Sequence, residues 1–233
     1  MARMERKYLA HFIDASFNGA TANYVRLGKD LESYNEELNP QVEIRRNILG
    51  EQNVIHQGYQ VQSTAEPFYA DQSDPLFEPL AAIANERKTG AGCQTTRVEY
   101  LMDASGNQIW AYREDCWVVP SAVGGDTSGV QLPFNVYNAG NRVPGIFNNS
   151  ATPKTFTVAT VSLSKVNSTL ATGANETLTV TKSPNSGTVK WSSSDTSVAT
   201  VTSAGKVTGV HAGKAVITAD FYGAKATCTY TIT

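Results

Sequence analysis

Residues 189–201, VKWSSSDTSVATV, and residues 205–219, GKVTGVHAGKAVITA, decide the fold of the C-terminal part of this 233-residue chain. Short runs of Val, Thr, Ile and Ala alternate there with turns built on Ser, Asp and Gly. The same pattern continues on both sides and predicts strands near 161–164, 176–181, 189–192, 198–202, 206–210, 215–220 and 226–232. Strands at this spacing predict a small β-sandwich over residues 154–233, with Trp191 in its core.

The two quoted stretches resemble the bacterial immunoglobulin-like domain, group 2. The recurring pattern of that family is W-x-S-S-D-x-S-V-A-x-V, followed by G-x-V-T-G-V-x-A-G-x-A-x-I-T. Here the signature positions are Trp191, Asp195, Gly205, Gly209 and Gly213. The family lacks catalytic residues and decorates adhesins, surface enzymes and phage structural proteins. The resemblance therefore implies display or weak surface binding, with host or mucosal surface glycans as partners.

Charge divides the chain at the same place. Residues 1–153 carry 18 acidic and 12 basic side chains, a net charge of −6, whereas residues 154–233 carry 3 acidic and 7 basic ones, a net charge of +4. The second part also holds 18 Thr and no Arg. We therefore expect two domains, one over residues 1–153 that ends in a linker from about residue 140, and one over residues 154–233. The overall net charge of −2 gives no sign of nucleic-acid binding.

The first part is expected to be mainly β with one helix. Residues 58–68 alternate as a strand, and residues 96–102 and 108–119 form a hairpin around the turn residues 103–107. A last strand is expected over residues 130–136.

The helix is expected directly after Asp74-Pro75, which read as an N-cap followed by proline at the first helical position. Leu76, Leu80 and Ile83 form its apolar stripe, Pro79 makes the first turn irregular, and Gly90 can close the C-terminus. The pattern indicates an amphipathic helix lying on a sheet.

Residues 5–150 are similar to the major tail tube proteins of long-tailed bacteriophages. The likeness is carried by YVRLGKDLESY at 24–34 with the Asn-Pro and Arg-Arg motifs that follow, by DPLFEPL at 74–80, and by the 99–117 hairpin. The resemblance implies a β-sandwich flanked by a helix, six subunits to a ring, and rings stacked into a tube. Its implied partners are further copies of the chain, the tape measure and other tail proteins, and genomic DNA passing through the lumen without specific binding.

Two sets of site residues follow from this resemblance. The excursion from about residue 38 to residue 54 is the candidate ring-stacking loop, with Asn39, Pro40, Arg45, Arg46 and Glu51. Glu32, Glu36 and Glu37 are candidate lumen carboxylates, which would repel DNA phosphate, although an ordinary solvated strand face explains them as well. An alternative function is that of a surface adhesin or carbohydrate-binding module without a tube.

Catalytic, cofactor and metal sites are not expected. The segment Gly209-Val-His-Ala-Gly213-Lys214 has three residues between its glycines where a phosphate loop needs four. His11, His56 and His211 show no metal-ligand spacing, and Cys93, Cys116 and Cys228 show no paired spacing. The N-terminus lacks the apolar run of a secretory signal or membrane helix. We therefore expect a non-enzymatic protein, made in the bacterial cytoplasm and located in the virion tail.

Overall fold

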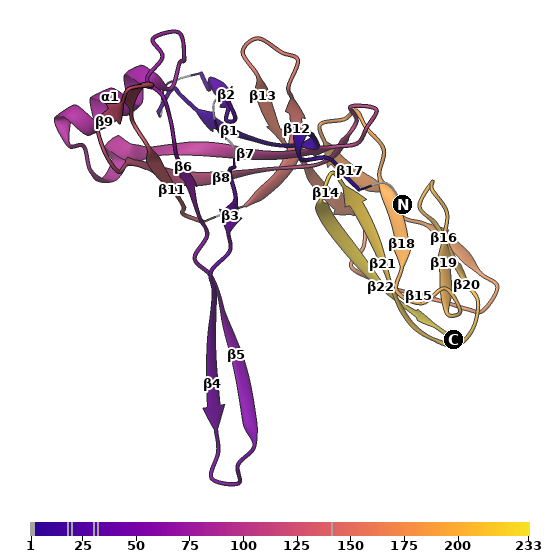
Figure 1. Cartoon of the computed structure of the whole chain (residues 1–233). Coiled ribbons are helices and arrows are strands. Elements are labelled where there is room, and N and C mark those ends of the chain that lie inside the picture. The colour runs from indigo at the N-terminus through magenta and orange to yellow at the C-terminus, as the bar shows by residue number, and fades with distance from the viewer. Residues whose placement is uncertain (1–2, 18, 20, 30, 32, 141) are drawn as a thin grey trace. The chain divides into compact units, whose positions relative to one another are not determined.

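The computed structural model describes residues 3–17, 19, 21–29, 31, 33–140 and 142–233, and Figure 1 shows its elements along the chain. Contacts within the chain define two compact units. Unit 1 comprises Met1–Glu99, Arg113–Arg142 and Asn149–Thr155, and unit 2 comprises Tyr100–Tyr112, Val143–Asn148 and Phe156–Thr233. The expectation of a mainly β chain is confirmed, and α1 (Phe77–Glu86) is the only α-helix among the described residues. No described helix is both long and apolar enough to cross a membrane.

A nine-stranded sheet forms the body of the N-terminal part. Its main path runs in the order β2-β1-β7-β8-β11-β6-β3, while β12 pairs with β8 and β13. A short ribbon of β9 (Gly124–Asp126) and β10 (Gly129–Gln131) stands apart from it. The strands of the large sheet are β1 (Leu9–Asp14), β2 (Tyr24–Arg26), β3 (Glu36–Glu37), β6 (Gln62–Ala65), β7 (Gln94–Met102), β8 (Gln108–Pro120), β11 (Phe134–Asn138), β12 (Val143–Asn148) and β13 (Thr155–Val158).

Several strand predictions need correction in detail. The expected hairpin is confirmed as neighbouring strands β7 and β8, with the amide of Asp103 donating to the carbonyl of Asn107 at 2.9 Å. The strand expected over 130–136 is split, because Pro133 has no N–H to donate and lies between β10 and β11. The run 58–68 is divided between the end of β5 (Gln52–Tyr59) and β6. The interpretation of residues 140–153 as a linker is wrong for Val143–Asn148, which forms β12.

Helix α1 begins two residues later than the sequence predicts. Asp74 organises the entry, because its Oδ1 accepts from the amide of Leu76 at 2.8 Å and its carbonyl accepts from the amide of Phe77 at 3.0 Å. The C-terminus is also different, since Arg87 takes a left-handed conformation with φ of 51°. The amide of Lys88 then donates to the carbonyl of Ile83 at 3.0 Å, so the helix ends before Gly90.

The apolar stripe of α1 packs on the sheet as predicted. Leu76, Leu80 and Ile83 are buried, and the first two join a cluster that includes Phe134 and Val136 of β11. Burial of such side chains is the main source of stability for this face of the sheet.

Replacing Leu80 by Ala should therefore lower the free energy of unfolding of the body by about 2–5 kcal/mol, because it leaves a cavity under the helix. Urea denaturation followed by circular dichroism measures the loss. Glu78→Ala, at an exposed position of the same helix, is the control and should change stability by less than about 0.5 kcal/mol.

The C-terminal strands form small sheets whose inner faces share one core. The sheets have the orders β15-β22-β21-β18, β16-β20-β19 and β14-β17. Tyr230 is fully buried with Ile217 and Val207, whereas Trp191 is only partly buried and packs against this cluster. The prediction that Trp191 lies inside the core is thus corrected: it packs against the core while partly exposed, and it lies on Gly205, where an added Cβ would be 2.6 Å from the indole.

The strands of this second set are β14 (Thr160–Leu163), β15 (Asn167–Leu170), β16 (Asn175–Thr177), β17 (Val180–Ser183), β18 (Lys190–Ser193), β19 (Ala199–Val201), β20 (Lys206–Gly209), β21 (Gly213–Phe221) and β22 (Ala224–Ile232).

Candidate functional site

A long two-stranded hairpin projects from the body of unit 1 (Figure 1). It consists of β4 (Pro40–Arg46), β5 (Gln52–Tyr59) and the turn between them, and we call it the hairpin arm. Its tip is well formed, because Oδ1 of Asn47 accepts from the amides of Leu49 and Glu51, both at 3.0 Å. The expected stacking loop is therefore an antiparallel hairpin, with one shift of register between Gln41 and Val42.

The two faces of the hairpin arm differ in character. Val42, Ile44 and Val54 lie on one face and are 51%, 59% and 57% exposed, with His56 opposite Val42 on the same face. The polar pair of Arg46 and Gln52 separates these residues from the tip. On the other face, where Ile55 lies opposite Glu43, Glu43 accepts from Arg45 at 2.8 Å and from Gln57 at 3.0 Å. At the tip, Ile48 and Leu49 are exposed as well. The apolar face and tip are defined together as the arm's apolar surface.

An isolated two-stranded hairpin is at best marginally stable in water. The hairpin arm also leaves the outer edges of both strands unpaired in its two-stranded sheet, and such edges readily pair with or pack on other chains. Exposed apolar side chains gathered on one face and at the tip of such an arm therefore indicate an interaction site.

The residues predicted for stacking all lie on this arm or at its root. Asn39 has a φ of 42° and its side chain donates to the carbonyl of Gln60 at 3.1 Å, which closes the root. Pro40 begins β4, while Arg45, Arg46 and Glu51 lie toward the tip. Sequence reasoning located the segment, but it missed the apolar residues that make it an interaction surface.

The three predicted lumen carboxylates do not form one exposed face. Glu32 lies outside the described residues. Glu37 is exposed and accepts from Gln62 at 3.3 Å. The side chain of Glu36 is only 11% exposed and pairs with Arg97, so the expected open face is wrong for Glu36.

Glu36 belongs to a buried charge cluster with Arg97, Glu99, Glu114 and Arg142. Arg97 pairs with Glu36 and lies 3.8 Å from Glu99. Arg142 lies 3.7 Å from both Glu36 and Glu114, and it pairs with Glu99. Burial, followed by the negative charge of Glu36, raises the pKa of Glu99. Burial likewise raises the pKa of Glu114.

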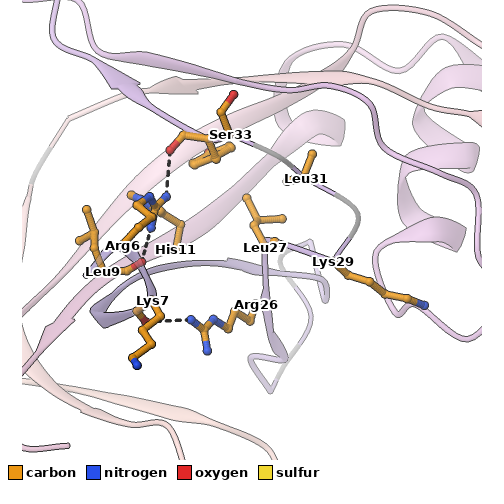
Figure 2. A pocket seen from close by; sticks show the side chains of 11 residues that line it. Arg6, Lys7, Leu9, His11, Arg26, Leu27, Lys29, Leu31 and Ser33 are labelled. Atoms are coloured by element: carbon orange, nitrogen blue, oxygen red, sulfur yellow. Dashed lines mark hydrogen bonds between the residues drawn. The ribbon is translucent and has the colours of Figure 1, made fainter. Parts of the chain in front are cut away.

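His11 borders this cluster on β1. His11 is 6% exposed, and the centroid of its ring lies 4.9 Å from that of Tyr34. It lines a pocket of about 680 Å³ together with Glu36, Glu99, Glu114 and Arg142. It also lines a second pocket of about 460 Å³, shown in Figure 2, where Arg6 donates to the carbonyl of Tyr34 at 2.9 Å.

Burial is the first cause that lowers the pKa of His11 to about 4, and the positive charge of Arg97 adds to it. The folded protein thus keeps His11 neutral between about pH 4 and its ordinary pKa of 6.5, whereas the unfolded chain takes up a proton. Protonation of the unfolded chain therefore lowers the free energy of unfolding as the pH falls from 6.5 toward 4, and this loss is absent above pH 6.5.

We expect His11→Gln to reduce the stability lost between pH 7 and pH 5 by about 2 kcal/mol, because the variant has no imidazole to protonate. Urea denaturation at the two pH values measures this difference. His56→Gln, on the exposed hairpin arm, is the matched control for the loss of an imidazole. An identical pH dependence of stability in His11→Gln and the unmodified protein would contradict the lowered pKa of His11.

The signature residues of the C-terminal part have structural roles in the described contacts. Oδ1 of Asp195 accepts from the hydroxyl and the amide of Ser197 at 2.6 and 2.9 Å, and these bonds lower the pKa of Asp195. Gly205 and Gly213 have φ of 78° and 155°, which favour glycine. At Gly209 an added Cβ would be 2.9 Å from the carbonyl of Ala171. These residues shape turns and close approaches between strands.

Comparison with known families adds to this description. Residues 157–227 match the bacterial Ig-like domain, group 2. This segment, less than a third of the chain, is similar to a bacterial Ig-like domain. The family match and the observed sheets confirm the expectation for the C-terminal part, and they do not test the tail tube resemblance of the remainder.

Curated proteins provide no match to the chain. Among solved structures, a C-terminal 282-residue fragment of intimin, in complex with the intimin-binding domain of the translocated intimin receptor, is similar at 13% identity. The TM-score is 0.31, and the alignment covers 60% of this chain and 58% of that one. At this score the likeness carries no argument about the fold or the partner of this chain.

Proposed function

We propose that the chain is a structural subunit that assembles with copies of itself through the hairpin arm and displays its Ig-like domain for weak attachment to surfaces. The observation that carries the proposal is the arm's apolar surface, with Ile44, Val54 and Ile48 at least half exposed. Packing against a neighbouring copy would remove these side chains from water and cover the free strand edges.

The resemblance of residues 5–150 to tail tube proteins suggests the arrangement of the copies. In the proposal, six subunits make a ring and stacked rings make the tail tube of a long-tailed phage. The net charge of −6 over residues 1–153 supports a DNA conduit, because carboxylates in a lumen repel phosphate. The tape measure and other tail proteins would then be partners, with the virion tail as the location, assembly in the bacterial cytoplasm and no catalytic role.

A surface adhesin without a tube is the second candidate. The family match covers residues 157–227, the domain through which an adhesin would bind its surface. It therefore supports this candidate without requiring a tube. The net charge of +4 over residues 154–233 supports weak attachment to anionic surfaces, such as mucosal glycans, that salt would screen.

Truncation after Val158 separates the two candidates while keeping β13 in the body sheet. For a tube subunit, electron microscopy should show rings or tubes from both the full and the truncated chain. Binding to a mucin-coated surface should be lost on truncation, and for the full chain it should weaken in about 0.5 M NaCl.

Rings from neither form, together with mucin binding by the full chain, would contradict the tube and support the adhesin. Equal mucin binding by the full and truncated chains would contradict attachment through the Ig-like domain.

A further inference from the structure

We propose that His11, Glu36 and Glu99 form a binding site for a divalent transition metal of the Zn²⁺ class. The three residues come from β1, β3 and β7, and one ligand atom from each lies within 4.8 Å of the others. Spacings of 25 and 63 residues along the chain explain why the sequence alone gave no metal motif.

The imidazole of His11 is the independent sign that a ligand belongs here. The residue is 94% buried, since 6% of its surface is exposed, and Nδ1 has no hydrogen-bond partner among the described residues. A buried polar nitrogen without a partner is costly, and coordination of a metal would satisfy it. The neutral ring is also the form that binds metals.

The two carboxylates are arranged as metal ligands commonly are. One oxygen of Glu36, Oε2, pairs with Arg97, while its other oxygen has only longer contacts, 3.5 Å to Asn138 and 3.7 Å to Arg142. For Glu99, the recorded ion pairs with Arg97 and Arg142 both use Oε2. Each carboxylate can therefore offer a second oxygen to an ion while a guanidinium orients the first, as outer-shell groups do at metal sites.

The charges around the three ligands are balanced. Arg97 and Arg142 pair with Glu36, Glu99 and Glu114, and Arg6 lines the same pocket. An ion would therefore be held by coordinate bonds rather than by a net negative charge, which favours a transition metal over Mg²⁺ or Ca²⁺. Oδ1 of Asn138 and Nη1 of Arg97, both buried, have no partner among the described residues.

One imidazole and two carboxylates suit Zn²⁺ better than Mg²⁺ or Ca²⁺, which prefer oxygen ligands alone. The pocket of about 680 Å³ beside the three side chains leaves room for water as a fourth ligand. Because Glu36 lies in β3, directly before the hairpin arm, a bound ion would tie the root of the arm to β1 and β7.

Titration of ZnCl₂ into the metal-free full chain, followed by calorimetry, tests the site. We expect one equivalent to bind, and His11→Gln and Glu99→Gln each to weaken binding at least about tenfold. His56→Gln and His211→Gln are matched controls, since both histidines are exposed and lie elsewhere. Circular dichroism of each variant separates loss of a ligand from loss of fold, and Glu99→Gln remains the test if His11→Gln unfolds.

Three results would overturn the proposal. They are no binding at millimolar ZnCl₂, unchanged binding in folded His11→Gln and Glu99→Gln, or loss of binding in either control. Equal affinity for MgCl₂ would contradict the assignment to the transition-metal class.

Discussion

Replacing Ile44 by Asp is expected to abolish self-assembly without unfolding the body. Ile44 is 59% exposed in the single chain, so the charge costs little there. In the assembled state the same carboxylate would be buried without a partner at the centre of the arm's apolar surface, which costs several kcal/mol. We expect association to weaken at least about 100-fold, as measured by sedimentation velocity over a range of protein concentrations.

Asn53→Asp is the matched control for Ile44→Asp. It adds the same charge to the same arm, but Asn53 pairs with Arg45, whose side chain belongs to the polar face. Assembly of Asn53→Asp should remain close to that of the unmodified chain. Equal loss of assembly in both variants would show that net charge matters rather than the apolar surface. Normal assembly of Ile44→Asp would remove this surface from the interface.

Replacing Arg97 by Ala should destabilise the body by about 3–5 kcal/mol. The side chain of Arg97 is 4% exposed, and its removal leaves Glu36 and Glu99 buried with one cation fewer. Buried carboxylates that lose a partner must either bear the cost of desolvation or take up a proton. Urea denaturation at pH 7 and pH 5 measures the loss, which should be smaller at pH 5.

Lys88→Ala is the control for the Arg97 substitution. Lys88 pairs with Glu86 at 3.3 Å on the surface, where such a pair contributes about 0–1 kcal/mol. Arg97→Met retains much of the side-chain volume and tests the charge separately. A loss below about 1 kcal/mol in both Arg97 variants would contradict a structural role for the buried pair.

Much of the C-terminal fold could be predicted because its determinants are local. The turn at Asp195 and the positive φ of Gly205 depend on residues close in sequence. Helix α1 was likewise evident from its apolar stripe. Its end was not, because the left-handed conformation falls on Arg87, a residue type with no special preference for it.

The hairpin arm was located from sequence, but its form and its apolar surface were missed. Val42 and Ile44 alternate in β4, and Val54 lies opposite Ile44 in β5. This alternation was available as a strand signal. Charged residues, Glu43 and Arg45, occupy the positions between and beside these apolar residues, so the segment resembles a solvated polar loop as much as a strand.

The buried charge cluster depends on tertiary contacts that one sequence does not reveal. A signal exists along the strands, because residues two apart share a sheet face. His11 follows the face of Ile13, Glu114 that of Cys116 and Asn138 that of Val136, so the core face changes from apolar to polar along these strands. Which charges pair across strands could be known only from the register.

Electron microscopy of the concentrated full-length protein tests self-assembly through the hairpin arm most directly. We predict rings or stacked rings in which density for β4 and β5 contacts the neighbouring copy. Particles that remain single copies at every concentration, or rings in which the arm touches no neighbour, would contradict it.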